Sequence, residues 1–168
     1  MKEKLYNHFL KIGPRRCVVG IVILLIILDI LNGIYLKGSW ALKNTSQQMV
    51  ILMIQMMKAS PADFDLDTMR EMSGLVDKAF DFLLFLLLFN NLFFYLFYLR
   101  KKLWAQGYVL FYTLTAGIFS ITMIFDGLGM GWGWMIFNIL TIPLYFYMYM
   151  AVKLLKNETT LEPKKKGR

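Results

Sequence analysis

The chain has 168 residues, of which 58% are hydrophobic and 16% aromatic, and its formal net charge is +8. A soluble domain of this length cannot bury so much apolar surface, so the composition excludes a soluble globular fold and indicates a membrane protein. The basic residues are spread along the chain and form no single recognition face, so we expect no nucleic-acid partner. Cys17 is the single cysteine, which excludes an internal disulfide.

The first two segments are basic and then apolar. Residues 1–16 form a basic N-terminal segment, which we expect to lie at the membrane interface as a short helix ending at Gly13 and Pro14. The apolar run over residues 17–36 is long enough to cross a hydrocarbon core of ~30 Å. A signal peptide also begins with basic residues, but this run is longer and no small-residue cleavage site follows it. We therefore expect a retained transmembrane helix.

The remaining apolar runs predict three more spans, at about 80–99, 108–125 and 132–152. Together the four spans form a transmembrane domain over residues 17–152, and a basic cytoplasmic tail, residues 153–168, follows it. The second and third connections are short, which favours antiparallel neighbours. The predicted fold class is therefore an all-α integral membrane protein with four transmembrane helices in an antiparallel bundle.

The one sizeable loop, residues 37–79, contains signals for short amphipathic helices. Thr45 or Ser46 can cap a first helix, and Thr68 with Glu71 has the spacing of a capping box for a second one. No helix-breaking residue separates the second helix from the next apolar run. We expect this helix to continue into the second span without a break.

Three alternating acids, Asp63, Asp65 and Asp67, resemble the start of a calcium-binding loop. The sixth position of that loop requires glycine, and the chain has Thr68 there; the twelfth requires glutamate, and the chain has Gly74. We therefore expect these acids to cap the second loop helix and to stabilise its positive N-terminal end.

The distribution of Lys and Arg predicts the orientation in the membrane. The N-terminal segment carries 5 of the 19, residues 100–102 carry 3 and the tail carries 6, whereas residues 126–131 carry none. The 5 in the long loop are balanced by five acids. Both termini are therefore predicted to be cytoplasmic, in a plasma or inner membrane, or in the endoplasmic reticulum of a eukaryote.

Asp29 is the main candidate for an ion or polar intramembrane site, because a carboxylate at the centre of a span costs at least ~2.5 kcal/mol. Asn32 lies one turn away on the same span, Asn90 and Asn91 lie on the second span and Asn138 on the fourth. Antiparallel threading places all of them in the middle or outer half of the bilayer. The alternative is that Asp29 is protonated and hydrogen-bonded to an asparagine as a helix contact.

Methionines cluster in the first loop helix, at Met49, Met53, Met56 and Met57. Thioethers suit Cu(I), so these residues form a weak candidate metal site. Apolar neighbours favour packing against the bundle or a partner instead. We therefore expect no metal and no cofactor.

Function is predicted only at the level of class. The sequence has no nucleophile–base pair and no acid–base pair, so we expect a non-enzymatic membrane protein. It would be either an oligomeric channel or transport component or an accessory subunit of a larger membrane complex. Its expected partners are the lipid bilayer and either further copies of the chain or a partner membrane subunit. The alternative is a membrane-embedded enzyme or carrier that acts on a lipid or small ion through Asp29 and Asp126.

Overall fold

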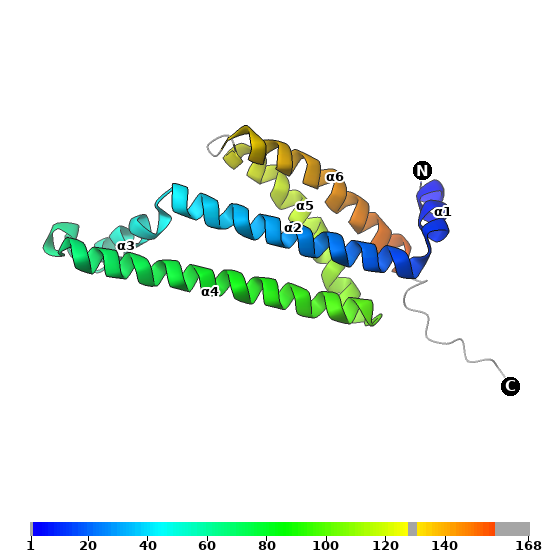
Figure 1. The fold of residues 1–168 in the computed structure, drawn as a ribbon, viewed down its shortest axis with the longest axis horizontal. Coiled ribbons are helices and arrows are strands. Elements are labelled where there is room, and N and C mark those ends of the chain that lie inside the picture. Colours follow the sequence, from blue (N-terminus) through cyan, green and yellow to red (C-terminus); the bar gives the residue numbers. More distant parts are fainter. Residues whose placement is uncertain (1, 128–130, 157–168) are drawn as a thin grey trace. The chain divides into compact units, whose positions relative to one another are not determined.

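The computed structural model describes residues 2–127 and 131–156, and within these ranges the regular structure is entirely helical (Figure 1). Six α-helices and one 3-10 turn follow one another along this part of the chain. The elements are α1 Lys2–Ile12, α2 Pro14–Leu42, α3 Thr45–Met56, η1 Pro61–Asp63, α4 Leu66–Leu99, α5 Leu103–Gly127 and α6 Trp132–Leu154.

Four of these helices, α2, α4, α5 and α6, are long and apolar enough to cross a membrane. Their composition explains this property, since each contains a window of 18 residues with at most two charged side chains. The prediction of an all-helical chain with four long apolar helices is confirmed. These helices indicate a membrane location.

Two of the four helices are much longer than a bilayer crossing requires. With 29 and 34 residues, α2 and α4 extend over about 43 Å and about 51 Å, against ~30 Å for a hydrocarbon core. The surplus lies at the C-terminal end of α2 and the N-terminal end of α4, where the sequence becomes polar. We call residues 37–81, which contain both ends together with α3 and η1, the headpiece.

The start of α4 shows which residues cap this helix. Asp65 Oδ1 accepts a hydrogen bond from the backbone N–H of Thr68 at 2.7 Å, so the prediction that an acid of this group caps the helix is confirmed. The predicted capping box of Thr68 and Glu71 is wrong, because the helix begins at Leu66 and both residues lie inside it. The helix then runs without a break to Leu99, as predicted.

The chain divides into two compact units, and each is described by itself. The first contains residues up to Leu28 and those from Asn91 onward, and α5 and α6 are its main pair. The two helices run antiparallel: Gln106 Nε2 donates to the backbone carbonyl of Val152 at 3.4 Å, and Thr141 Oγ1 donates to Ser120 Oγ at 3.3 Å.

The N-terminal helix α1 packs on α6 within this first unit. The rings of Phe9 and Tyr147 lie edge to face with centroids 5.1 Å apart, and Tyr147 Oη lies 3.3 Å from His8 Nε2. Gly13 has a φ of +92°, which allows the chain to turn between α1 and α2. The buried Cys17 thiol then donates to the carbonyl of Phe9 at 3.6 Å, which ties the start of α2 to α1.

The second unit contains residues 29–90, which are the C-terminal half of α2, all of α3 and η1, and most of α4. Its α2 and α4 segments run antiparallel, because Gly33 lies beside Leu88 and Lys37 beside Asp81. Figure 1 shows α3 beside the first turns of α4, and a hydrogen bond of 3.0 Å from Ser73 Oγ to Ser46 Oγ joins them.

Candidate functional site

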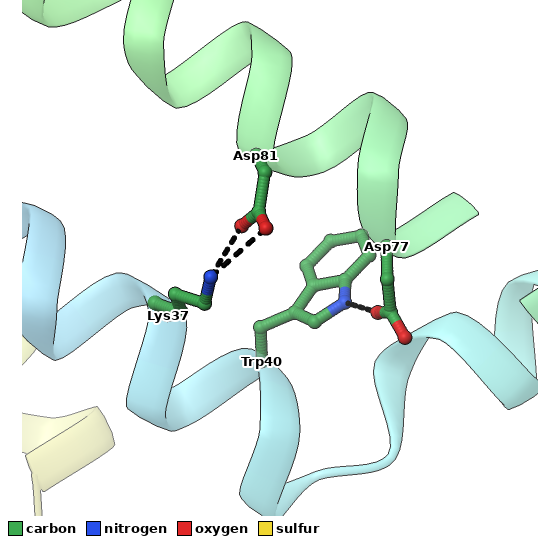
Figure 2. Close-up of polar contacts among 4 residues, drawn as sticks. All are labelled: Lys37, Trp40, Asp77 and Asp81. Carbon is green, nitrogen blue, oxygen red and sulfur yellow. Dashed lines mark hydrogen bonds and ion pairs between the residues drawn. The ribbon is translucent and has the colours of Figure 1, made fainter. Parts of the chain in front are cut away.

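A polar clamp joins α2 to α4 at the point where both helices leave their apolar runs (Figure 2). We define the clamp as Lys37 and Trp40 on α2 with Asp77 and Asp81 on α4. Lys37 Nζ lies 2.9 Å from each carboxylate oxygen of Asp81. The Lys37 side chain is 63% exposed and the Asp81 side chain 50% exposed. An ion pair with this exposure contributes at most about 1 kcal/mol to stability.

Trp40 makes the stronger part of the clamp. Its indole Nε1 donates to Asp77 Oδ1 at 2.8 Å, as Figure 2 shows. Its ring also stacks on Phe80 with a centroid distance of 4.0 Å and an interplanar angle of 10°. The spacings explain the arrangement, since Lys37 and Trp40 are three residues apart and Asp77 and Asp81 four apart, so each pair lies on one helix face.

The clamp lies in the wall of a pocket of about 420 Å³ within the headpiece. Ser46 and Gln47 of α3 complete the lining, together with Ser73 of α4. One ammonium and two carboxylates face this pocket, and none of them is paired with a nucleophile or a general base in the manner that acyl or phosphoryl transfer requires. The arrangement can therefore bind polar groups and hold three helices together.

Sequence reasoning missed the clamp. Asp81 lies inside the predicted second span, and Lys37 and Asp77 were counted only as loop charges. The sequence does contain a signal, because polar residues replace apolar ones after Leu36 on α2 and before Phe80 on α4. When these two helices run antiparallel, the two points lie side by side.

The Ser46–Ser73 hydrogen bond directs one face of α3 toward α4. Ser46, Val50 and Ile54, spaced four residues apart, are buried. A second apolar face is exposed beside them, and Met56 within it has 76% of its surface accessible. We call this face the α3 stripe; its residues are Met49, Leu52, Met53 and Met56.

The α3 stripe has two properties of a surface that docks on a partner. Its residues follow the i, i+3, i+4, i+7 spacing of a helix that docks along one face. It also lies in the headpiece, outside the apolar runs of α2 and α4. No residue of α3 is charged, and the exposed side of the helix next to Leu52 carries Gln48 and Gln55, which point away from Met53. The four methionines proposed as a weak metal site, including Met57, are all exposed.

The predicted intramembrane polar residues lie in both units. Asp29, Asn32 and Asn90 belong to the second unit, whereas Asn91 and Asn138 belong to the first. Asp29 is only 5% exposed, Asn32 is half-buried and Asn90 is exposed. A single site that contains all five residues therefore stays a prediction.

The two asparagines of the first unit have partners there. The hydroxyl of Tyr108 donates to the amide oxygen of Asn91, which joins α4 to α5. Asn138 Nδ2 donates to the carbonyl of Trp134 at 2.9 Å, and Thr141 Oγ1 donates to the carbonyl of Asn138 at 2.9 Å. These contacts are typical of structural hydrogen bonding in membrane helices. The side chain of Asp126 lies outside the described residues.

Among the described residues, no group of three or more His, Cys, Asp or Glu side chains lies close enough to hold a metal ion. The chain was also compared with known proteins. It matches no protein-family model, no curated protein and no solved structure.

Proposed function

We propose that this chain is a non-enzymatic polytopic membrane protein whose function depends on assembly, and that copies of it associate through the α3 stripe. The observation that carries the proposal is the exposure of Met49, Leu52, Met53 and Met56 in a segment beyond the apolar runs of α2 and α4. Exposed apolar patches in such a position are typical of protein interfaces. Methionine side chains are flexible and adapt to the surface they meet.

A second copy is the partner that fits this surface. A twofold interface brings the same patch of both subunits together, so a patch with a net charge meets a patch with the same net charge. The α3 helix has no charged residue over its length, so two copies can pack without electrostatic repulsion. We propose that the self-assembled protein is an oligomeric channel or transport component.

Disulfide crosslinking tests this contact. In a Cys17→Ala background, Met53→Cys places a thiol within the stripe and Gln55→Cys places one about 160° away around the same helix. We expect oxidation of the Met53→Cys protein in membranes to give a covalent dimer of twice the 19.7 kDa chain, and the Gln55→Cys protein to give far less. Equal crosslinking at both positions, or none at Met53→Cys, would contradict association through the stripe.

A second candidate function rests on Asp29, which is buried within a continuous apolar helix. A carboxylate in this position is a candidate for proton or ion transfer in a carrier. Asp29→Asn keeps the size and hydrogen-bonding capacity of the side chain and removes its charge. If Asp29 takes part in transport, this variant should insert and fold normally but lose proton or ion flux in proteoliposomes. An unchanged proton or ion flux would remove Asp29 from the mechanism.

A further inference from the structure

A hollow of about 290 Å³ lies between α5 and α6 at the end of the pair that contains the start of α5 and the end of α6. From α5, Leu103, Gly107 and Leu110 line it at i, i+4 and i+7, the spacing of a continuous groove along one helix face. On the other side, Lys153 in the last turn of α6 and Lys156, which follows the end of this helix, line it. The hollow is therefore apolar along one wall and basic along the other.

Gly107 keeps the apolar wall open. A Cβ atom added at this position would meet no atom within 4 Å, although the residue lies inside α5, where glycine is an unfavourable choice. Next to it, Gln106 is buried and its amide donates to the carbonyl of Val152, which fixes α5 against α6 beside the hollow. The groove is thus formed by a pair of helices whose spacing is fixed.

The described charged side chains that line the hollow are all basic. Its lining, as far as the chain is described, contains two lysines and no carboxylate. Lys153 Nζ lies 5.4 Å above the ring of Tyr149 and donates to its hydroxyl at 3.5 Å, a long hydrogen bond that a stronger acceptor can replace. Residues 100–102, all basic, directly precede Leu103 in the same unit. The field at this end of α5 and α6 therefore attracts an anion.

We propose that this hollow is a binding site for one anionic phospholipid, with its phosphate bound by Lys153 and Lys156 and an acyl chain lying along Gly107 and Leu110. An amphiphile matches the division of the site into a basic wall and an apolar groove. Basic pockets between transmembrane helices on the cytoplasmic side bind lipid headgroups of this kind. The positive-inside distribution of the basic residues predicts that this end of the helices is cytoplasmic. The site is independent of the α3 stripe.

The test uses the full-length protein in a neutral detergent and measures its thermal unfolding midpoint as lipid is added. We expect palmitoyl-oleoyl-phosphatidylglycerol to raise the midpoint in a saturable way, and palmitoyl-oleoyl-phosphatidylcholine to have a much smaller effect. Lys153→Gln and Lys156→Gln should each weaken the apparent affinity for phosphatidylglycerol about fivefold, the value for loss of one lysine near an anionic headgroup.

Two leucine substitutions separate the groove from general electrostatics. Gly107→Leu fills the hollow without changing the charge, and we expect it to abolish the effect of phosphatidylglycerol. Gly133→Leu makes the same change at another open glycine, at the opposite end of α6, and should leave the effect intact. Because leucine is a better helix former than glycine, both variants should fold, which circular dichroism can verify.

Three results would overturn the proposal. The first is an equal shift with both lipids, and the second is a phosphatidylglycerol effect that survives Gly107→Leu. The third is an equal shift with inorganic phosphate at the same concentration, which would show that the lysines bind a free anion and that the groove holds no acyl chain. The two lysine variants provide an independent check if Gly107→Leu fails to fold.

Discussion

Asp65 determines where α4 begins. Its carboxylate accepts the backbone N–H of Thr68 at 2.7 Å, and hydrogen bonds from the Thr68 side chain and backbone hold the pKa of Asp65 below its ordinary value. A lowered pKa means that the folded helix favours the charged carboxylate. The contribution of this cap to stability is therefore present above the unfolded pKa of about 3.9 and is lost as the pH falls through the lower folded value.

This pH dependence is measurable by hydrogen exchange at the start of α4. After correction for the intrinsic rate, protection of the Thr68 amide should stay level from pH 7 to about pH 5 and fall below about pH 4, where Asp65 becomes protonated. Asp65→Asn should remove this change, because asparagine caps without a titratable charge. Asp67→Asn is the matched control, since Asp67 pairs with Arg70 at 3.7 Å and its loss should leave the change in place. The same pH profile in Asp65→Asn would contradict the role of this carboxylate.

Single residues differ in how far their roles can be read from the sequence. The cap by Asp65 was predictable because its partner is only three residues away. The pairs Lys37–Asp81 and Trp40–Asp77 were not, because they join residues 44 and 37 positions apart and depend on the register of two helices. Asn91 and Asn138 were singled out as polar residues within the predicted spans, but their hydrogen-bond partners follow from packing that the sequence pattern does not specify.

The close contact between α5 and α6 depends on Gly117. A Cβ atom at this position would lie 3.3 Å from Cβ of Tyr145, which is fully buried, whereas a Cβ atom at Gly107 on the same helix would meet nothing within 4 Å. Small residues of this kind allow membrane helices to approach closely. The two glycines therefore provide a matched comparison within one helix.

Alanine substitutions at these two positions should have opposite effects on stability. Gly107→Ala should raise the free energy of unfolding by up to about 1 kcal/mol, because alanine has the higher helix propensity and the space is open. Gly117→Ala should show no gain or a loss, because the added methyl group pushes against Tyr145. Unfolding of the purified protein in mixed detergent micelles measures both values. An equal gain from both substitutions would show that α5 and α6 are not in close contact at Gly117.

Whole elements were more predictable than their ends. The unbroken α4 follows from the absence of any breaker between the loop signal and the apolar run, and the structure confirms it. The start of α3 differs from the prediction of a cap by Thr45 or Ser46. Asn44 precedes the helix with a φ of +47° and makes no side-chain cap, while the Ser46 hydroxyl is buried against Ser73. Tertiary contact with α4 has replaced the local cap, and local sequence rules cannot anticipate this exchange.

The complete molecule combines four long apolar helices with a headpiece whose α3 face is apolar and exposed. Composition and Lys/Arg distribution predict the membrane location and the orientation, because both depend on counts along the chain. The headpiece could be predicted only as a loop with helices. Its exposed stripe depends on which side of α3 packs against α4, and only the structure shows that Val50 and Ile54 take that side while Leu52 and Met56 stay outside.

The particle mass of the full-length protein in mild detergent is the measurement that decides whether the stripe assembles copies of the chain. We expect a mass that corresponds to two or more chains of 19.7 kDa after subtraction of the detergent. Met53→Glu with Met56→Glu should reduce it to a single chain, because it places like charges across a symmetric apolar interface. Gln48→Glu with Gln55→Glu adds the same charge at exposed positions of α3 beyond the stripe, which point away from Met53, and should leave the mass unchanged. A single-chain particle for the unmodified protein, or equal masses for all three proteins, would contradict assembly through α3.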